Sequence, residues 1–133
     1  MPVPTVDTTA ACLSSAKEGQ TSCGSDVCRL AARVEPGPRA LSPLAYDAES
    51  RSLVLFGGDR LNELLGDTWV YDGKRWSRRD VAGPPARRLA VSGTVCGRVV
   101  LFGGWDGREP LGDTWEWDGA RWAWRDVPGP SAR

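Results

Sequence analysis

The apolar positions of this chain fall into short runs that recur along the sequence, and none of these runs has helical spacing. The run "LVLFGG" at 53–58 returns as "VVLFGG" at 99–104, and "LGDTW" follows each of them. A continuous apolar run of this length is typical of a strand that is buried on both faces. The segment after "LGD" alternates instead: Trp69 and Tyr71 point to one side and Val70 to the other, as in a half-buried strand. The pattern predicts an all-β chain.

Each repeat contains four predicted strands separated by turn residues. They cover 44–46, 53–56, 67–72 and 75–79 in the first repeat, and 90–92, 99–102, 113–118 and 121–125 in the second. The dipeptides Asp72-Gly73 and Asp118-Gly119 stand before the last strand of each repeat and are typical of tight hairpins. Four antiparallel strands whose inner members are more apolar than the outer ones describe a propeller blade.

The two repeats are related by a constant offset of 46 residues, since Phe56 matches Phe102 and Trp76 matches Trp122 without a gap. Periods of this length are typical of propellers and solenoids. A third "GP" pair, at 129–130, follows the second by the same offset. The predicted organisation is an irregular leader or linker (1–33), two blades (34–82 and 83–128) and the start of a truncated third repeat (129–133).

These elements resemble the kelch repeat, in which two glycines follow four apolar residues and an aromatic residue and a tryptophan come further on. In this chain the matching residues are Gly57, Gly58, Tyr71 and Trp76, and then Gly103, Gly104, Trp117 and Trp122. The "LGDTW" variant is similar to kelch units of bacterial proteins with a galactose-oxidase-like propeller, although Trp117 replaces the usual tyrosine. The resemblance covers about 37–130. It implies a partial kelch-type β-propeller that acts as a protein-protein interaction module.

The repeated residues are expected to be architectural. The double glycines should let the backbone turn with positive φ and leave space for the large rings of a neighbouring blade. Trp69, Trp76, Trp115 and Trp122 should provide the flat areas by which one sheet packs on another. Asp67 and Asp113 should accept backbone N–H bonds at the entry to the third strand. Because both aspartates recur at the same repeat position, they indicate architecture rather than a catalytic pair.

The variable connections between these repeated elements are better candidates for function. Antiparallel strands place the second-to-third and fourth-to-first connections of a blade on one side, which we call the loop face. An exposed tryptophan beside arginines suits a protein or peptide contact, and the same residue types also suit a sugar. Alternatively, Trp105 folds back over its own blade and the charges only solvate the rim. The candidate binding residues are Asp59, Arg60, Arg87, Arg88, Trp105, Asp106 and Arg108.

Composition narrows the classes of function. Seventeen basic residues balance seventeen acidic ones, so no net field attracts nucleic acid or an anionic membrane. The chain has no histidine, which excludes a Ser-His-Asp or Cys-His site and removes the ligands that a copper oxidase would need. We expect a non-catalytic module without metal or cofactor. The alternative is a piece of a larger kelch-like enzyme, such as a copper oxidase or a sialic-acid mutarotase, or of a carbohydrate-binding propeller, whose site lies in further blades.

The cysteines and the first residues leave the compartment open. Cys12, Cys23 and Cys28 are clustered near the N-terminus and Cys96 stands apart, a spacing that fits no zinc pattern well. A Cys23–Cys28 disulfide and free thiols are the two alternatives. Clustered cysteines favour an oxidising compartment, whereas the first residues lack the basic start and apolar core of a signal peptide.

Two blades leave apolar sheet faces and strand edges without partners. Closed propellers have at least about four blades, so we expect either a fragment of a longer chain or several copies that assemble into a ring. Of these two, the repeated "GP" favours the fragment. On its own, the chain is expected to be poorly folded or oligomeric.

Overall fold

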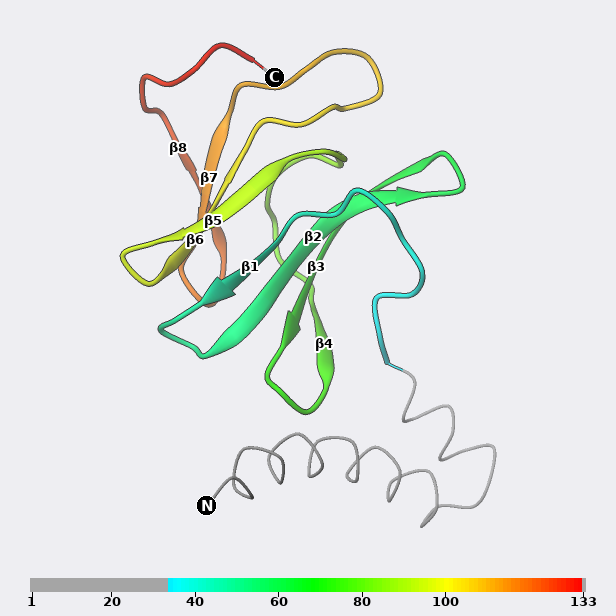
Figure 1. Cartoon of the computed structure of the whole chain (residues 1–133), viewed down its shortest axis with the longest axis vertical. Coiled ribbons are helices and arrows are strands. Elements are labelled where there is room, and N and C mark those ends of the chain that lie inside the picture. The colour runs from blue at the N-terminus through cyan, green and yellow to red at the C-terminus, as the bar shows by residue number, and fades with distance from the viewer. Residues whose placement is uncertain (1–33, 133) are drawn as a thin grey trace, which may run out of the picture.

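The chain folds into two four-stranded antiparallel sheets (Figure 1). The structure is a computed structural model and describes residues 34–132. The first sheet contains β1 (Leu44–Asp47), β2 (Ser52–Arg60), β3 (Glu63–Tyr71) and β4 (Trp76–Arg79), in that order. The second contains β5 (Val91–Val95), β6 (Arg98–Phe102), β7 (Thr114–Trp117) and β8 (Trp122–Arg125). Residues 34–132 contain no helix, and the prediction of an all-β fold is confirmed.

No helix in the described part of the chain is long and apolar enough to cross a membrane. The predicted leader, with Cys12 and the proposed Cys23–Cys28 disulfide, lies outside the described residues. Cys96 is described, and it is an exposed free thiol.

The two Asp-Gly turns close the hairpins between β3 and β4 and between β7 and β8. The Asp72 carboxylate accepts the backbone N–H groups of Lys74 at 2.8 Å and Arg75 at 3.0 Å. Asp118 does the same at the equivalent turn. These backbone hydrogen bonds hold the pKa of both carboxyl groups below the usual value. The turns therefore form where the sequence predicts them.

The first strand of the second repeat lies later in the chain than the gapless comparison predicts. Leu55 pairs with Trp69 as Leu101 pairs with Trp115, an offset of 46 residues. Ala45, however, pairs with Val54 as Gly93 pairs with Val100, so β1 and β5 are offset by 48. The predicted strand at 90–92 is therefore only partly right, because the strand runs from Val91 to Val95.

Two compensating changes in length produce this shift. The β1–β2 turn has four residues (48–51), and the β5–β6 turn has only Cys96 and Gly97. Both of these have positive φ, 50° and 82°, as a two-residue hairpin of type I′ requires. The segment before β5 is correspondingly two residues longer, so that Arg87 occupies the place of Arg39.

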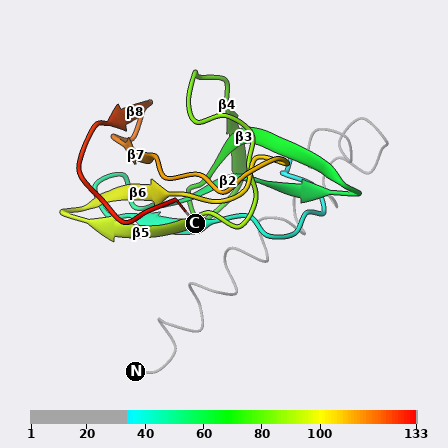
Figure 2. The same cartoon turned by 90° about the horizontal axis from the view of Figure 1, so that it is seen from above.

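The sheets pack face to face around a shared apolar core. The first sheet contributes what we call its trailing face, with Ala45, Val54, Phe56, Thr68 and Val70 buried. The second contributes its leading face, with Val99, Leu101, Trp117 and Trp122 buried and Trp115 partly buried. β1 lies against β5, and the last strands, β4 and β8, form the opposite edges of their sheets (Figure 2). This is the arrangement of two successive propeller blades, with β1 and β5 nearest the axis.

Trp122 is the central residue of this interface. Its ring meets the edge of Phe56 at a centroid distance of 5.7 Å and an interplanar angle of 74°. Its indole N–H donates a buried hydrogen bond to the Thr68 hydroxyl at 2.9 Å. Trp117 lies beside it, with ring centroids 5.4 Å apart. The prediction that Trp122 packs sheet on sheet is confirmed.

The double glycines accommodate main chain and not aromatic rings. Gly57 and Gly58 have φ values of 55° and 100°, so the expected left-handed backbone is present. A Cβ on Gly57, however, would lie 2.6 Å from the Leu65 carbonyl oxygen and 2.7 Å from that of Arg87. The glycine that makes room for a tryptophan is Gly83, where a Cβ would lie 2.6 Å from the Trp122 ring. The prediction of positive φ at the double glycines is confirmed, and the prediction that they make room for aromatic rings is wrong.

Replacing Trp122 by alanine is expected to lower the free energy of unfolding by about 3–5 kcal/mol, because it empties the centre of the interface. Trp124→Ala is the matched control, since this tryptophan on the same strand is 59% exposed and should change the free energy by less than about 0.5 kcal/mol. Urea unfolding followed by fluorescence measures both. Equal losses in the two variants would contradict the packing described here.

Candidate functional site

Three of the seven candidate binding residues come together at the loop face. Backbone hydrogen bonds pair Ala40 with Asp59 in the first sheet and Arg88 with Trp105 in the second. The segment that enters each sheet is thereby tied to the residue that directly follows the double glycine. Asp59, Arg88 and Trp105 thus belong to one continuous surface.

An ion pair joins the two sheets at this surface. Arg88 Nη1 lies 2.5 Å from Asp59 Oδ2, and the two side chains are 32% and 13% exposed. Asp59 Oδ1 and Arg88 Nε are buried without a hydrogen-bond partner among the described residues. The pair therefore retains one acceptor and one donor that are not used internally.

Trp105 is half-buried, with its backbone paired to Arg88 on one side and to Pro110 on the other. Asp106, the next residue, accepts the backbone N–H groups of Glu109 and Arg108 at 2.9 and 2.7 Å. These bonds hold the pKa of Asp106 below its usual value. Asp106 is therefore engaged in its own turn, whereas Arg108 is exposed.

Two candidate residues do not lie free on the loop face. Arg60 donates to the backbone carbonyl oxygens of Pro38 at 3.1 Å and Pro36 at 2.8 Å, and so fixes the segment that enters the first sheet. Arg87 has no exposed surface. The prediction that Arg87 is a surface binding residue is wrong, because its guanidinium is enclosed by a hydrogen-bonded network.

In this network a buried arginine binds an aspartate that also binds a tryptophan. Arg87 donates to both carboxylate oxygens of Asp113, at 2.6 and 2.7 Å, and to the Gly103 carbonyl at 3.0 Å. The Trp115 indole N–H donates to the same carboxylate at 2.7 Å. Asp113 was expected to accept backbone N–H bonds, but its main partners are these two side chains.

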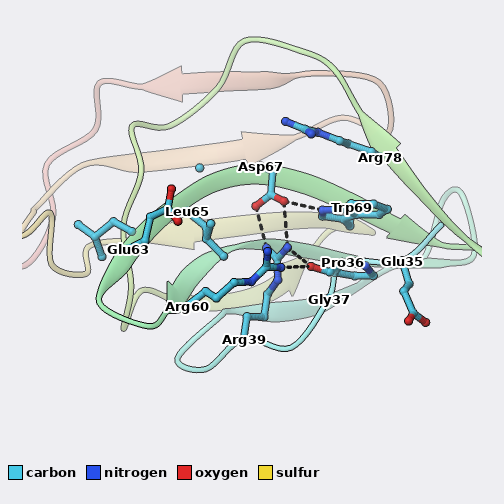
Figure 3. A pocket seen from close by; sticks show the side chains of 12 residues that line it. Glu35, Pro36, Gly37, Arg39, Arg60, Glu63, Leu65, Asp67, Trp69 and Arg78 are labelled. Carbon is cyan, nitrogen blue, oxygen red and sulfur yellow. Dashed lines mark hydrogen bonds and ion pairs between the residues drawn. The ribbon is translucent and has the colours of Figure 1, made fainter. Parts of the chain in front are cut away.

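The first sheet contains the same network, which Figure 3 shows. Arg39 donates to the Asp67 carboxylate at 2.7 and 3.0 Å, and Trp69 donates to it at 2.6 Å. Burial raises the pKa of Asp67, but the hydrogen bonds from Arg39 and Trp69 outweigh burial and bring it below the usual value. The pKa of Asp113 is lowered in the same way. Both carboxylates are therefore held ionised by an arginine and a tryptophan.

Arg87 also connects the two sheets through its backbone. Its carbonyl accepts the Gly58 N–H at 2.9 Å and its N–H donates to the Leu65 carbonyl at 3.2 Å, both in the first sheet. Its side chain is bound in the second sheet. A single buried residue thus fixes the two sheets relative to each other beneath the loop face.

A comparison of the chain with protein families finds a match that coincides with the second sheet. The family model described as "Kelch motif" matches residues 86–131. The chain contains a kelch motif. The match begins just before Arg87 and includes the whole second sheet, and the first sheet has the same strand order. The kelch match and the strand-rich structure fit blades of a kelch-repeat β-propeller. Kelch repeats generally mediate protein-protein interactions.

Among residues 34–132, no group of three histidine, cysteine, aspartate or glutamate side chains is placed to hold a metal ion. Asp67 and Asp113 are each bound to an arginine. What the loop face offers is the half-buried ring of Trp105, the partly exposed Arg88 and the exposed Arg108.

The bonds between Arg87 and Asp113 predict that substitutions of these two residues have strongly coupled effects on the free energy of unfolding. Asp113→Ala should lower the free energy of unfolding by about 3–5 kcal/mol, because it leaves the Arg87 charge buried and unpaired. The double variant Arg87→Met, Asp113→Leu should recover most of this loss, and urea unfolding of the full double-mutant cycle measures the recovery.

The matched control is Glu116→Ala, which breaks a pair whose Arg98 and Glu116 side chains are 41% and 22% exposed. This variant should change stability by about 1 kcal/mol or less. A loss for Asp113→Ala no larger than the control would show that the buried network does not hold the kelch sheets.

Proposed function

We propose that these kelch blades are a non-catalytic module that binds a protein or peptide through the loop face. The observation that carries the proposal is the junction of Asp59, Arg88 and Trp105, which two sheets bring together on one surface. Tryptophan and arginine are the residue types that most often dominate protein interfaces.

Three exposed leucines lie within two residues of Ala40, Asp59 and Arg88 along the chain. Leu61, in the turn between β2 and β3, is 95% exposed. Leu41 and Leu89, next to Ala40 and Arg88, are 47% and 57% exposed. Both have positive φ, and the Leu89 N–H donates to the Leu41 carbonyl at 2.9 Å. Exposed apolar side chains near a polar centre suit a protein partner.

We also propose that further blades complete the ring, either from a longer chain or from self-association.

The proposal is tested by selecting peptides from a random library on the full chain and measuring their affinity by fluorescence anisotropy. Trp105→Ala should weaken the selected peptides at least about tenfold, because it removes the aromatic side chain from the centre of the surface. Trp124→Ala, an exposed tryptophan on β8, should leave their affinity unchanged.

Peptides that bind Trp105→Ala as tightly as the natural chain would place the binding surface elsewhere. A glycan array probed with the natural chain and with Trp105→Ala addresses the carbohydrate alternative. Binding to a glycan that is lost in Trp105→Ala, without any peptide selected, would replace the proposal by a sugar-binding one.

A further inference from the structure

One face of the first sheet packs against no other sheet within residues 34–132, although residues 36–39 lie over one end of it, where Trp69 is only 7% exposed. This leading face bears Leu53, Leu55, Trp69, Tyr71 and Trp76, and at one end it forms a hollow of about 570 Å³. Pro36, Arg39, Asp67, Trp69 and Arg78 lie around the hollow in Figure 3. Tyr46 and Leu44, on the adjoining strand, are 47% and 49% exposed.

The equivalent face of the second sheet is already an interface. Asp67 and Trp69, in the hollow, correspond to Asp113 and Trp115, and Trp76 corresponds to Trp122. On the second sheet this face is covered by the trailing face of the first sheet. The part of the leading face around Trp76 is therefore the place where another trailing face fits.

The second sheet presents such a trailing face, also uncovered. In the observed interface, Trp122 contacts Phe56 by its ring and Thr68 by its N–H. Phe102 and Thr114 occupy the positions of Phe56 and Thr68 on the second sheet. All three side chains of the observed contact thus recur, unchanged, on the two free faces.

Two substitutions make the free trailing face more polar, since Arg98 occupies the position of the buried Ser52 and Glu116 that of the buried Val70. The Glu116 carboxylate, however, is paired with Arg98 at 3.2 Å and Arg125 at 2.5 Å on the same face. A carboxylate that keeps its partners is far less costly to cover than an unpaired one. Glu116 does not prevent the face from being covered.

We propose that the free leading face of one chain binds the free trailing face of a second copy of this chain, head to tail. Trp76 of one copy then packs on Phe102 of the next and donates its indole N–H to Thr114. The interface is heterologous, so it generates a ring if it closes and a filament if it does not. Propellers of four to eight blades correspond to two to four copies. The inference rests on the proposed function only in treating both sheets as propeller blades.

The C-terminal segment competes with this contact. Ala132 lies over Gly112 as Ala86 lies over Gly66, with its Cα in both cases 3.2 Å from where the glycine's Cβ would be. Arg39 occupies the place of Arg87, so Pro38 of an incoming copy corresponds to Ala86. Pro38 would therefore lie over Gly112 of the first copy, at the place that Ala132 now occupies. Residues 128–132 must leave Gly112 when the second copy binds. Ala132→Trp, which cannot fit over Gly112, should strengthen the association.

The test measures the mass of the full chain in solution by light scattering across a range of concentrations. The natural chain should form oligomers, and Trp76→Ala and Phe102→Ala should each be monomeric. A mixture of these two variants should form a dimer and nothing larger, since only one intact pair of faces remains. Trp124→Ala is the matched control and should assemble like the natural chain.

A natural chain that stays monomeric at every concentration overturns the proposal, and so does a mixture that fails to associate when the natural chain is oligomeric. Circular dichroism shows whether each variant is folded. If Trp76→Ala is not, Leu44→Asp on the same face replaces it, because Leu44 is already half exposed. Trp105→Ala should leave the mass unchanged, so failure of assembly and failure of peptide binding are distinguished.

Discussion

The insertion of Trp122 between the two sheets is the interaction on which the rest of the structure depends. A four-stranded sheet has two faces and can cover neither of them by itself, so it needs a neighbour. Trp122 supplies a large ring for the Phe56 edge and an N–H for the buried Thr68 hydroxyl. The hydrogen bond fixes the direction of the ring, and the ring fixes the distance between the sheets. The orientation of the blades follows from this contact together with the hydrogen bonds of Arg87.

That orientation has two consequences for function. It aligns the connections of both sheets at one end, where Arg87 fastens them from beneath and the Asp59–Arg88 pair joins them at the surface. It also leaves one face of each sheet uncovered. The loop face is thus fastened at two points, while the uncovered faces carry the residues of an interface that the chain already contains.

The sequence was sufficient for the strands that follow strong local signals. Three of the four strands in each repeat could be placed because apolar runs, alternation and the Asp-Gly turns coincide there. The shift of β5 was hidden, because a turn shortened by two residues and a connection lengthened by two leave the period unchanged. The role of Arg87 was missed for the same reason, since the gapless comparison sets Arg39 against Pro85. An arginine shortly after each "GP" pair was the signal that could have revealed it.

The loop face was only partly predictable. Topology alone places its connections on one side, so Asp59, Arg88 and Trp105 could be grouped from the sequence. Which polar side chains are consumed internally depends on distances that no pattern encodes, as the different fates of Arg87 and Arg108 show. The glycine roles were likewise misjudged, because the close neighbours of Gly57 are carbonyl groups brought in from distant segments.

Hydrogen exchange of the indole N–H groups, followed by NMR, tests the packing of the two sheets most directly. The Trp122 N–H is buried and bonded to Thr68, so it should exchange far more slowly than that of Trp124, which belongs to the same strand and is 59% exposed. Exchange at equal rates in the two indoles would show that the sheets do not pack as successive blades.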